Sequence, residues 1–154
     1  MLQKILVCLD GSSLAEQILP YATEQALRFG SKVVLLQVIG EPRAIPSPVP
    51  GEPVFVMLPE PEQIEREQNE ATAYLESVAQ PLREKGLDVE CVALPGTPSD
   101  AIVSYAAESE VDLIAIATHG RSGLRRLTFG SVADFVLRES GLPILLIKPR
   151  EPET

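Results

Sequence analysis

The chain has 154 residues, and its 22 acidic and 13 basic side chains give a formal net charge of −9. Hydrophobic residues make up 45% and charged residues 23% of the sequence, which is typical of a globular protein and not of a disordered one. The length fits one domain, residues 1–154, because domains usually hold roughly 100–200 residues. The acidic excess argues against a nucleic-acid partner, because phosphate backbones are bound by clustered Lys and Arg.

The first apolar run is far shorter than a membrane span. It covers residues 5–9, whereas a span needs roughly 20 residues, and it is also too short for the core of a signal peptide. Cys8 and Cys91 lie outside any C-x-x-C motif, so neither a disulfide framework nor a zinc site is indicated. We therefore expect no membrane partner, two free thiols and a reducing cytoplasmic location.

Short apolar runs alternate with longer helical patterns along the chain. Runs such as 33–36 and 113–116 are almost continuously apolar, which is typical of parallel strands covered on both faces. Strands and helices in alternation, joined by right-handed crossovers, predict an α/β fold with a doubly wound, five-stranded parallel sheet and helices on both faces. The expected strands are 3–9, 32–38, 88–94, 112–117 and 143–147.

Capping residues, prolines and glycines mark the expected helix boundaries. The first helix should begin at a capping box opened by Ser13, kink at Pro20 and end at Gly30. The others are expected over about 61–85, from a capping Thr97 followed by Pro98, and from Gly130–Ser131.

A proline-rich segment separates the second expected strand from the second helix. Seven of the 14 prolines lie between Pro42 and Pro61 without any period, which predicts a long loop over about 40–60. Such a loop either covers a site or is a tolerated surface insertion. The six Glu and one Arg between Glu60 and Glu76 indicate a solvated face on the second helix.

Two segments are expected to meet where open α/β sheets bind ligands, beyond the carboxyl ends of the strands. Asp10 follows the first strand, and the glycine-punctuated segment 117–132 follows the fourth. Backbone N–H groups at Gly130–Val132 could receive a phosphate at the start of the last helix. Residues 118–138 carry a local charge of +3, from Arg121, Arg125, Arg126 and Arg138 against Asp134. One small anion is thus compatible with the acidic chain.

Each of these residues also has a structural interpretation. Asp10 could only shape a turn, Ser131 could only cap a helix, and Gly120 and Gly130 could only serve turns. His119 is the sole histidine, and no nucleophile with a base and an orienting acid can be assembled around it, so a hydrogen-bonding role in the loop is favoured over general-base chemistry.

The sequence lacks both common nucleotide fingerprints, the P-loop and a G-x-G-x-x-G after the first strand. It has instead Ala117-Thr118-His119-Gly120, nine residues, and then Gly130-Ser131, with Asp10-Gly11-Ser12 near the front. Across essentially the whole chain, this arrangement resembles the universal stress protein family. The ATP-binding branch of that family has the pattern G-x2-G-x9-G-[ST], and here Ala117 stands at the first glycine position.

The resemblance implies a Rossmann-like fold of the adenine nucleotide alpha hydrolase-like type, with strand order 3-2-1-4-5. It implies binding of ATP, or of ADP or AMP, with Mg²⁺ held mainly by the phosphates and by no metal site of the protein. The binding residues implied are Leu9, Asp10, Val38, Ala117, Thr118, His119, Gly120, Arg121, Ser122, Gly130, Ser131 and Val132.

The same resemblance implies a regulatory protein of the stress response and not an enzyme. Occupancy would be its output, with at most slow ATP hydrolysis, because no P-loop lysine and no base to activate water are evident. It also implies a homodimer through the strand at 143–148. The alternatives are an interaction protein of the same fold that binds no nucleotide, and a small α/β enzyme that uses the crevice.

Overall fold

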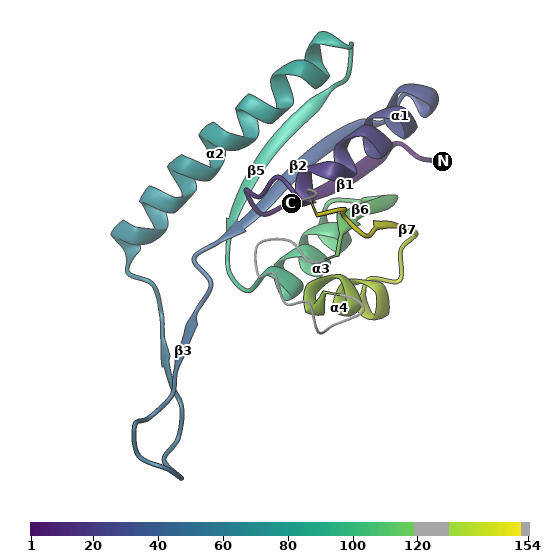
Figure 1. Cartoon of the computed structure of the whole chain (residues 1–154). Coiled ribbons are helices and arrows are strands. Elements are labelled where there is room, and N and C mark those ends of the chain that lie inside the picture. The colour runs from purple at the N-terminus through teal and green to yellow at the C-terminus, as the bar shows by residue number, and fades with distance from the viewer. Residues whose placement is uncertain (119–129, 152–154) are drawn as a thin grey trace.

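The computed structural model describes residues 1–118 and 130–151. Its main sheet has five parallel strands in the order β5-β2-β1-β6-β7 (Figure 1). The order confirms the expected doubly wound sheet, since these are the first to fifth strands of the predicted set. The strands are β1 (Lys4–Leu9), β2 (Lys32–Ile39), β5 (Val89–Pro95), β6 (Leu113–Ala117) and β7 (Ile144–Ile147).

Both faces of the sheet are covered by helices, as expected. Ile5 and Val7 pack into a core beneath α1 (Leu19–Phe29) and α2 (Pro61–Glu84). Leu6 and Cys8 alternate with them and pack into a second core beneath α3 (Pro98–Glu108) and α4 (Ser131–Glu139). Successive side chains of a strand point to opposite faces, so a strand apolar at every position is buried on both.

The start of the first helical segment differs from the prediction. A 3₁₀ turn, η1 (Ala15–Ile18), precedes α1, and the hydroxyl that accepts a backbone hydrogen bond there is that of Ser12, 3.2 Å from the N atom of Ala15. Ser13 therefore does not open a capping box. Pro20 lies in the first turn of α1, where no intrahelical N–H bond is needed, so it starts the helix instead of kinking it.

Helices α3 and α4 begin where predicted, but Thr97 and Ser131 do not act as side-chain caps. Thr97 does occupy the N-cap position of α3, but its side chain makes no capping hydrogen bond, and Pro98 is the first helical residue. Gly130 is the N-cap of α4 and Ser131 is already inside the helix, so Ser131 is not a helix cap. The C-cap of α1 is Gly30 in the left-handed conformation, as expected.

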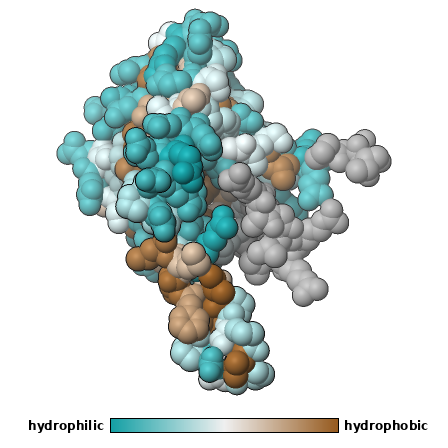
Figure 2. All heavy atoms as spheres, turned by 90° about the vertical axis from the view of Figure 1, so that its left-hand side faces the viewer, coloured by the Kyte–Doolittle hydropathy of each residue, from teal (hydrophilic) through white to brown (hydrophobic). Residues whose placement is uncertain are grey.

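The proline-rich segment is an extended β-hairpin and not an irregular loop. The short strands β3 (Arg43–Ile45) and β4 (Phe55–Met57) pair antiparallel, and the hairpin reaches away from the body of the molecule (Figure 1). We call residues 41–60 the arm. Apolar side chains gather on its surface in Figure 2. The sequence did not indicate these strands, because each is only three residues long and prolines, which are unfavourable in strands, lie on both sides of it.

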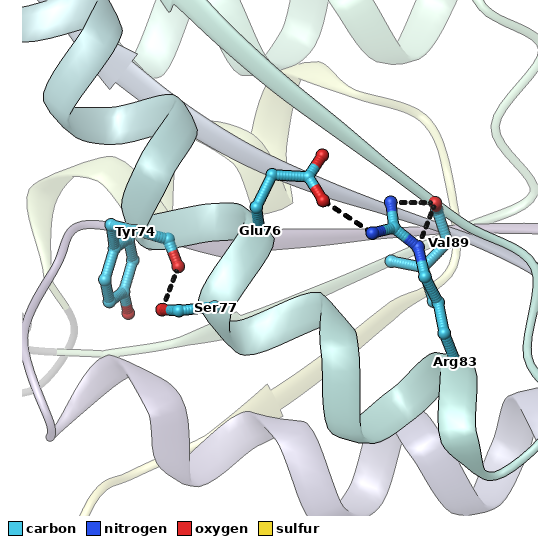
Figure 3. A network of polar contacts seen from close by, with 5 residues as sticks. All are labelled: Tyr74, Glu76, Ser77, Arg83 and Val89. Carbon is cyan, nitrogen blue, oxygen red and sulfur yellow. Dashed lines mark hydrogen bonds and ion pairs between the residues drawn. The ribbon is translucent and has the colours of Figure 1, made fainter.

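The carboxyl-terminal half of α2 is tied to the sheet edge by one guanidinium (Figure 3). Arg83 donates to the carbonyl oxygen of Val89 through Nη2 at 2.8 Å and to Glu76 Oε2 through Nη1 at 2.5 Å. The hydrogen bond from Arg83 lowers the pKa of Glu76, although its burial acts in the opposite direction. Tyr74 lies two residues before Glu76 on the same helix, and its carbonyl accepts a hydrogen bond from the Ser77 hydroxyl at 2.6 Å. Arg83 thus anchors the helix that carries Tyr74.

Both cysteines are free, as predicted. Burial raises the pKa of the Cys8 thiol to about 12 and that of Cys91 to about 11. Neither is a reactive thiolate at neutral pH. In the part of the chain that is described, no helix combines the length and the apolar character needed to cross a membrane.

Candidate functional site

A cavity of about 260 Å³ lies where β1 and β6 end and α4 begins. Connections leave β1 and β6 in opposite directions along the sheet, so this is the switch point at which doubly wound folds bind ligands. Apolar side chains from both helices of one face, such as Ile102 and Ala133, form part of its wall. Seven of the predicted binding residues line it: Leu9, Asp10, Val38, Ala117, Gly130, Ser131 and Val132.

The remaining predicted residues are placed differently. Thr118 is 2% exposed and does not line the cavity, and its backbone N–H donates to the carbonyl oxygen of Ile147 at 2.9 Å. It therefore ties β6 to β7. The predictions for His119, Gly120, Arg121 and Ser122 lie outside the described residues.

Asp10 shapes the corner after β1, as its structural interpretation predicted. Its Oδ1 accepts hydrogen bonds from the backbone N of Ser12 at 2.9 Å and from the Ser12 hydroxyl at 2.5 Å. Gly11 between them has a φ of +84°, a conformation that favours glycine. The turn holds the carboxyl group at the cavity wall, so the structural role and a binding role are compatible.

The amino-terminal end of α4 forms the opposite wall. Gly130 has φ −58° and ψ 144°, which any L-residue can adopt, so the backbone does not require a glycine here. What the glycine provides is the absence of a side chain beside the first helical N–H groups. Those groups carry the positive end of the helix dipole, and the residues at this end, Gly130, Ser131 and Val132, line the cavity. A small anion could approach them closely.

One arginine counted toward a basic site belongs elsewhere. Arg138 lies in the last turn of α4 and is paired with Asp134 one turn earlier, with 71% of its side chain exposed. It does not line the cavity. The pair is a local i,i+4 interaction of a helix surface, which explains why a charge count over the segment overstated the positive charge near the cavity. Arg121, Arg125 and Arg126 lie outside the described residues.

A second, polar cavity of about 610 Å³ adjoins the first and shares Asp10, Gln37, Val38 and Glu41 with it. Glu67 and Glu70 of α2 line it as well. The predicted solvated acidic face is confirmed for the exposed Glu60, Glu62, Glu65, Glu70 and Glu76. Glu67 is the partly buried exception, and its Oε2 accepts a hydrogen bond from the N atom of Gly40 at 2.8 Å. The carboxylates make this side unfavourable for phosphate, which leaves the α4 side for any anionic group.

Tyr74 also lines the polar cavity. Burial first, and then the negative charges of Glu16 and Asp10, raise the pKa of its hydroxyl. The hydroxyl therefore stays protonated at physiological pH and remains a hydrogen-bond donor. Among residues 1–118 and 130–151, no cluster of three or more His, Cys, Asp or Glu side chains could hold a metal ion.

Several cavity residues were missed from the sequence. Pro98 and Ile102 come from the first turns of α3, and Leu36 and Gln37 from the end of β2. The start of α3 was predicted correctly at Pro98, and a helix that begins at the carboxyl edge of a sheet contributes its first turn to the crevice. The predicted start of α3 at this edge could therefore have identified Ile102, a buried residue of its first turns, as a cavity residue.

The fold and the cavity define a doubly wound α/β protein with a candidate ligand site at the switch point of its sheet. Comparison with known proteins identifies the family. The Universal stress protein family model matches residues 1–148, so the chain belongs to the universal stress protein family. Universal stress protein YxiE of Bacillus subtilis is 30% identical over 151 residues, covering 96% of this chain and 100% of YxiE. Universal stress protein MJ0577 of Methanocaldococcus jannaschii is 31% identical, covering 96% of each chain.

Solved structures agree with the fold. A structure of MJ0577 superimposes with a TM-score of 0.78 over 99% of both chains, at 24% identity. The universal stress protein from Archaeoglobus fulgidus in complex with dAMP gives a TM-score of 0.65, with 26% identity, 96% of this chain and 100% of that chain.

Proposed function

We propose that this protein binds an adenine nucleotide in the cavity between Asp10 and Gly130, and that ATP, or ADP or AMP, is its ligand. The observation that carries the proposal is the cavity itself, which lies at the switch point of the sheet and is lined by apolar side chains and by the first residues of α4. The complex of the Archaeoglobus fulgidus protein with dAMP supports it, as do similar folds solved with cAMP and with AMP.

The residues present fit such a ligand in two parts. The apolar stretch that includes Val38 and Ile102 suits a purine, and Asp10 can accept hydrogen bonds from a ribose or a ring amine. The phosphates would lie at Gly130–Val132, away from the carboxylates of the polar cavity. Mg²⁺ would be held mainly by those phosphates.

We propose occupancy, and not turnover, as the output of the site. Gly130 and the start of α4 can stabilise bound phosphate, but that contact favours the bound ground state as much as a transition state. Hydrolysis of ATP would then be slow at most. A role in the stress response, in the cytoplasm, agrees with the family and with two unreactive free thiols.

A fluorescent ATP analogue tests the binding proposal. The chain has no Trp, so intrinsic background is low. We expect a saturable signal that unlabelled ATP, ADP or AMP displaces and that GTP displaces far less. Absence of binding at millimolar ATP with Mg²⁺ would favour an interaction protein of the same fold, and steady turnover at ordinary enzyme rates would favour the enzyme.

We also propose a homodimer through the strand at 143–148. β7 pairs with β6 on one side only in the described sheet, and its four residues are all partly exposed. An edge of this kind accepts a second strand. Light scattering should then report at least twice the 16.7 kDa of one chain, and a species of 16.7 kDa alone would contradict the dimer.

A further inference from the structure

Large apolar side chains are concentrated on the exposed surface of the arm. Seven of its large apolar side chains are 42–72% exposed, and five of them are consecutive. Figure 2 shows them gathered below a largely hydrophilic body. A two-stranded hairpin is marginally stable on its own, and an apolar patch of this kind usually marks an interface. The seven are Ile45, Val49, Val54, Phe55, Val56, Met57 and Leu58.

The two edges of the hairpin differ in their capacity to pair. β3 is flanked directly by Pro42 and Pro46, which have no N–H to donate. The stretch 54–58 contains no proline, and β4 within it pairs with β3 on one side only in the described structure. In the described structure, the outer edge of β4 therefore presents backbone donors and acceptors, beside apolar side chains, to which another strand could pair.

We propose that this edge pairs antiparallel with the same segment of a second copy of this chain. A two-fold axis at Val56 would place Phe55 of one copy opposite Met57 of the other, and Val54 opposite Leu58. Antiparallel pairing about such an axis is self-complementary, because each copy supplies the same edge and the same side chains. The two paired arms would form a four-stranded sheet, which is more stable than an isolated two-stranded hairpin.

The available area and charge favour a second copy over a lipid surface. The five consecutive side chains at 54–58, which are 57–72% exposed, supply on the order of 600 Å² per arm, which approaches the roughly 800 Å² that each partner buries in a specific interface. The arm carries Glu41, Glu52 and Glu60 against Arg43, so an anionic membrane surface would repel it.

The first test compares two valine-to-lysine variants of the same arm. Val56 is 64% exposed and central to β4, whereas Val49 is 51% exposed and lies near the hairpin tip, outside both strands. Neither substitution disturbs a core, which circular-dichroism melting curves will check. In sedimentation velocity, we expect Val56→Lys to have half the mass of Val49→Lys or less. Equal masses over the whole concentration range would overturn the proposal.

A second test reports the register directly. With Cys91→Ser as background, Val56→Cys would lie opposite its own copy at the axis, where directly opposite Cβ atoms are about 4.5–5.5 Å apart. A disulfide needs about 3.5–4.5 Å, so a small approach of the two strands brings the thiols into bonding distance. We expect oxidised Val56→Cys to form a covalent dimer at least about tenfold faster than Val49→Cys does. Equal rates would contradict the pairing, and neither variant touches the edge of β7, so a dimer through that strand is distinguished from this one.

Discussion

Gly130→Val will weaken adenine-nucleotide binding by at least about tenfold, or about 1.4 kcal/mol, while leaving the protein folded. Gly130 already has φ −58° and ψ 144°, so valine meets no backbone strain. Its branched side chain would instead stand between the cavity and the first N–H groups of α4, where we place the phosphates. Isothermal titration with ATP and Mg²⁺ measures the affinity, and thermal melting checks the fold.

Glu60 offers a matched control for this substitution. It is the N-cap of α2 with φ −72° and ψ 151°, close to the values of Gly130, and its side chain makes no capping bond. It does not line the cavity. Glu60→Val therefore adds the same side chain at a comparable helix start, and we expect unchanged affinity. If Gly130→Val binds as tightly as Glu60→Val, the phosphate position is wrong.

Asp10→Ala will lower nucleotide affinity by roughly 10- to 100-fold, because a hydrogen bond to a charged group contributes about 1.5–3 kcal/mol. The same change removes the acceptor of both Ser12 hydrogen bonds, so a loss of stability of about 1 kcal/mol accompanies it. Titration with ATP and chemical denaturation separate the two effects.

Ser12→Ala distinguishes a binding carboxylate from a turn residue. It removes the hydroxyl that donates to Asp10 and accepts from Ala15, but it leaves the carboxylate at the cavity wall. We expect a comparable loss of stability with an affinity within about threefold of the parent. An equal loss of affinity in both variants would show that Asp10 acts through the turn alone.

The sheet could be predicted from the sequence because a strand buried on both faces has a simple signature. Ile5 and Leu6 face opposite cores, and no polar residue interrupts the run to Leu9. Strand alternation predicts a parallel sheet but does not determine its order, which came from the resemblance to a family. The strand order of the structure agrees with it.

Sequence patterns for helix caps and loops gave wrong predictions where the same residues fit two different local structures. Ser12 and Ser13 are equivalent as caps in a sequence, and only the Asp10 turn decides that Ser12 accepts the bond. In the arm, prolines indicate a loop, yet their spacing leaves a proline-free stretch at 54–58 for β4.

Site residues at the ends of strands and at the starts of helices could be predicted from the sequence. Residues whose place at the cavity depends on tertiary packing could not. Asp10 and Gly130 flank strand and helix ends, which are visible in the sequence. Arg138 was assigned to a basic cluster because a charge count does not show where a side chain points. Its pairing with Asp134 along the helix could not be predicted from composition. Ile102 is simply a buried apolar residue until the fold places it at the cavity wall.

The most direct test of nucleotide binding is a crystal structure of the protein grown with ATP and Mg²⁺. We predict density for purine and ribose in the cavity between Asp10 and Val38, with the phosphates at the N-terminus of α4 beside Gly130. An empty cavity at saturating ATP, or nucleotide bound elsewhere on the molecule, would contradict the account.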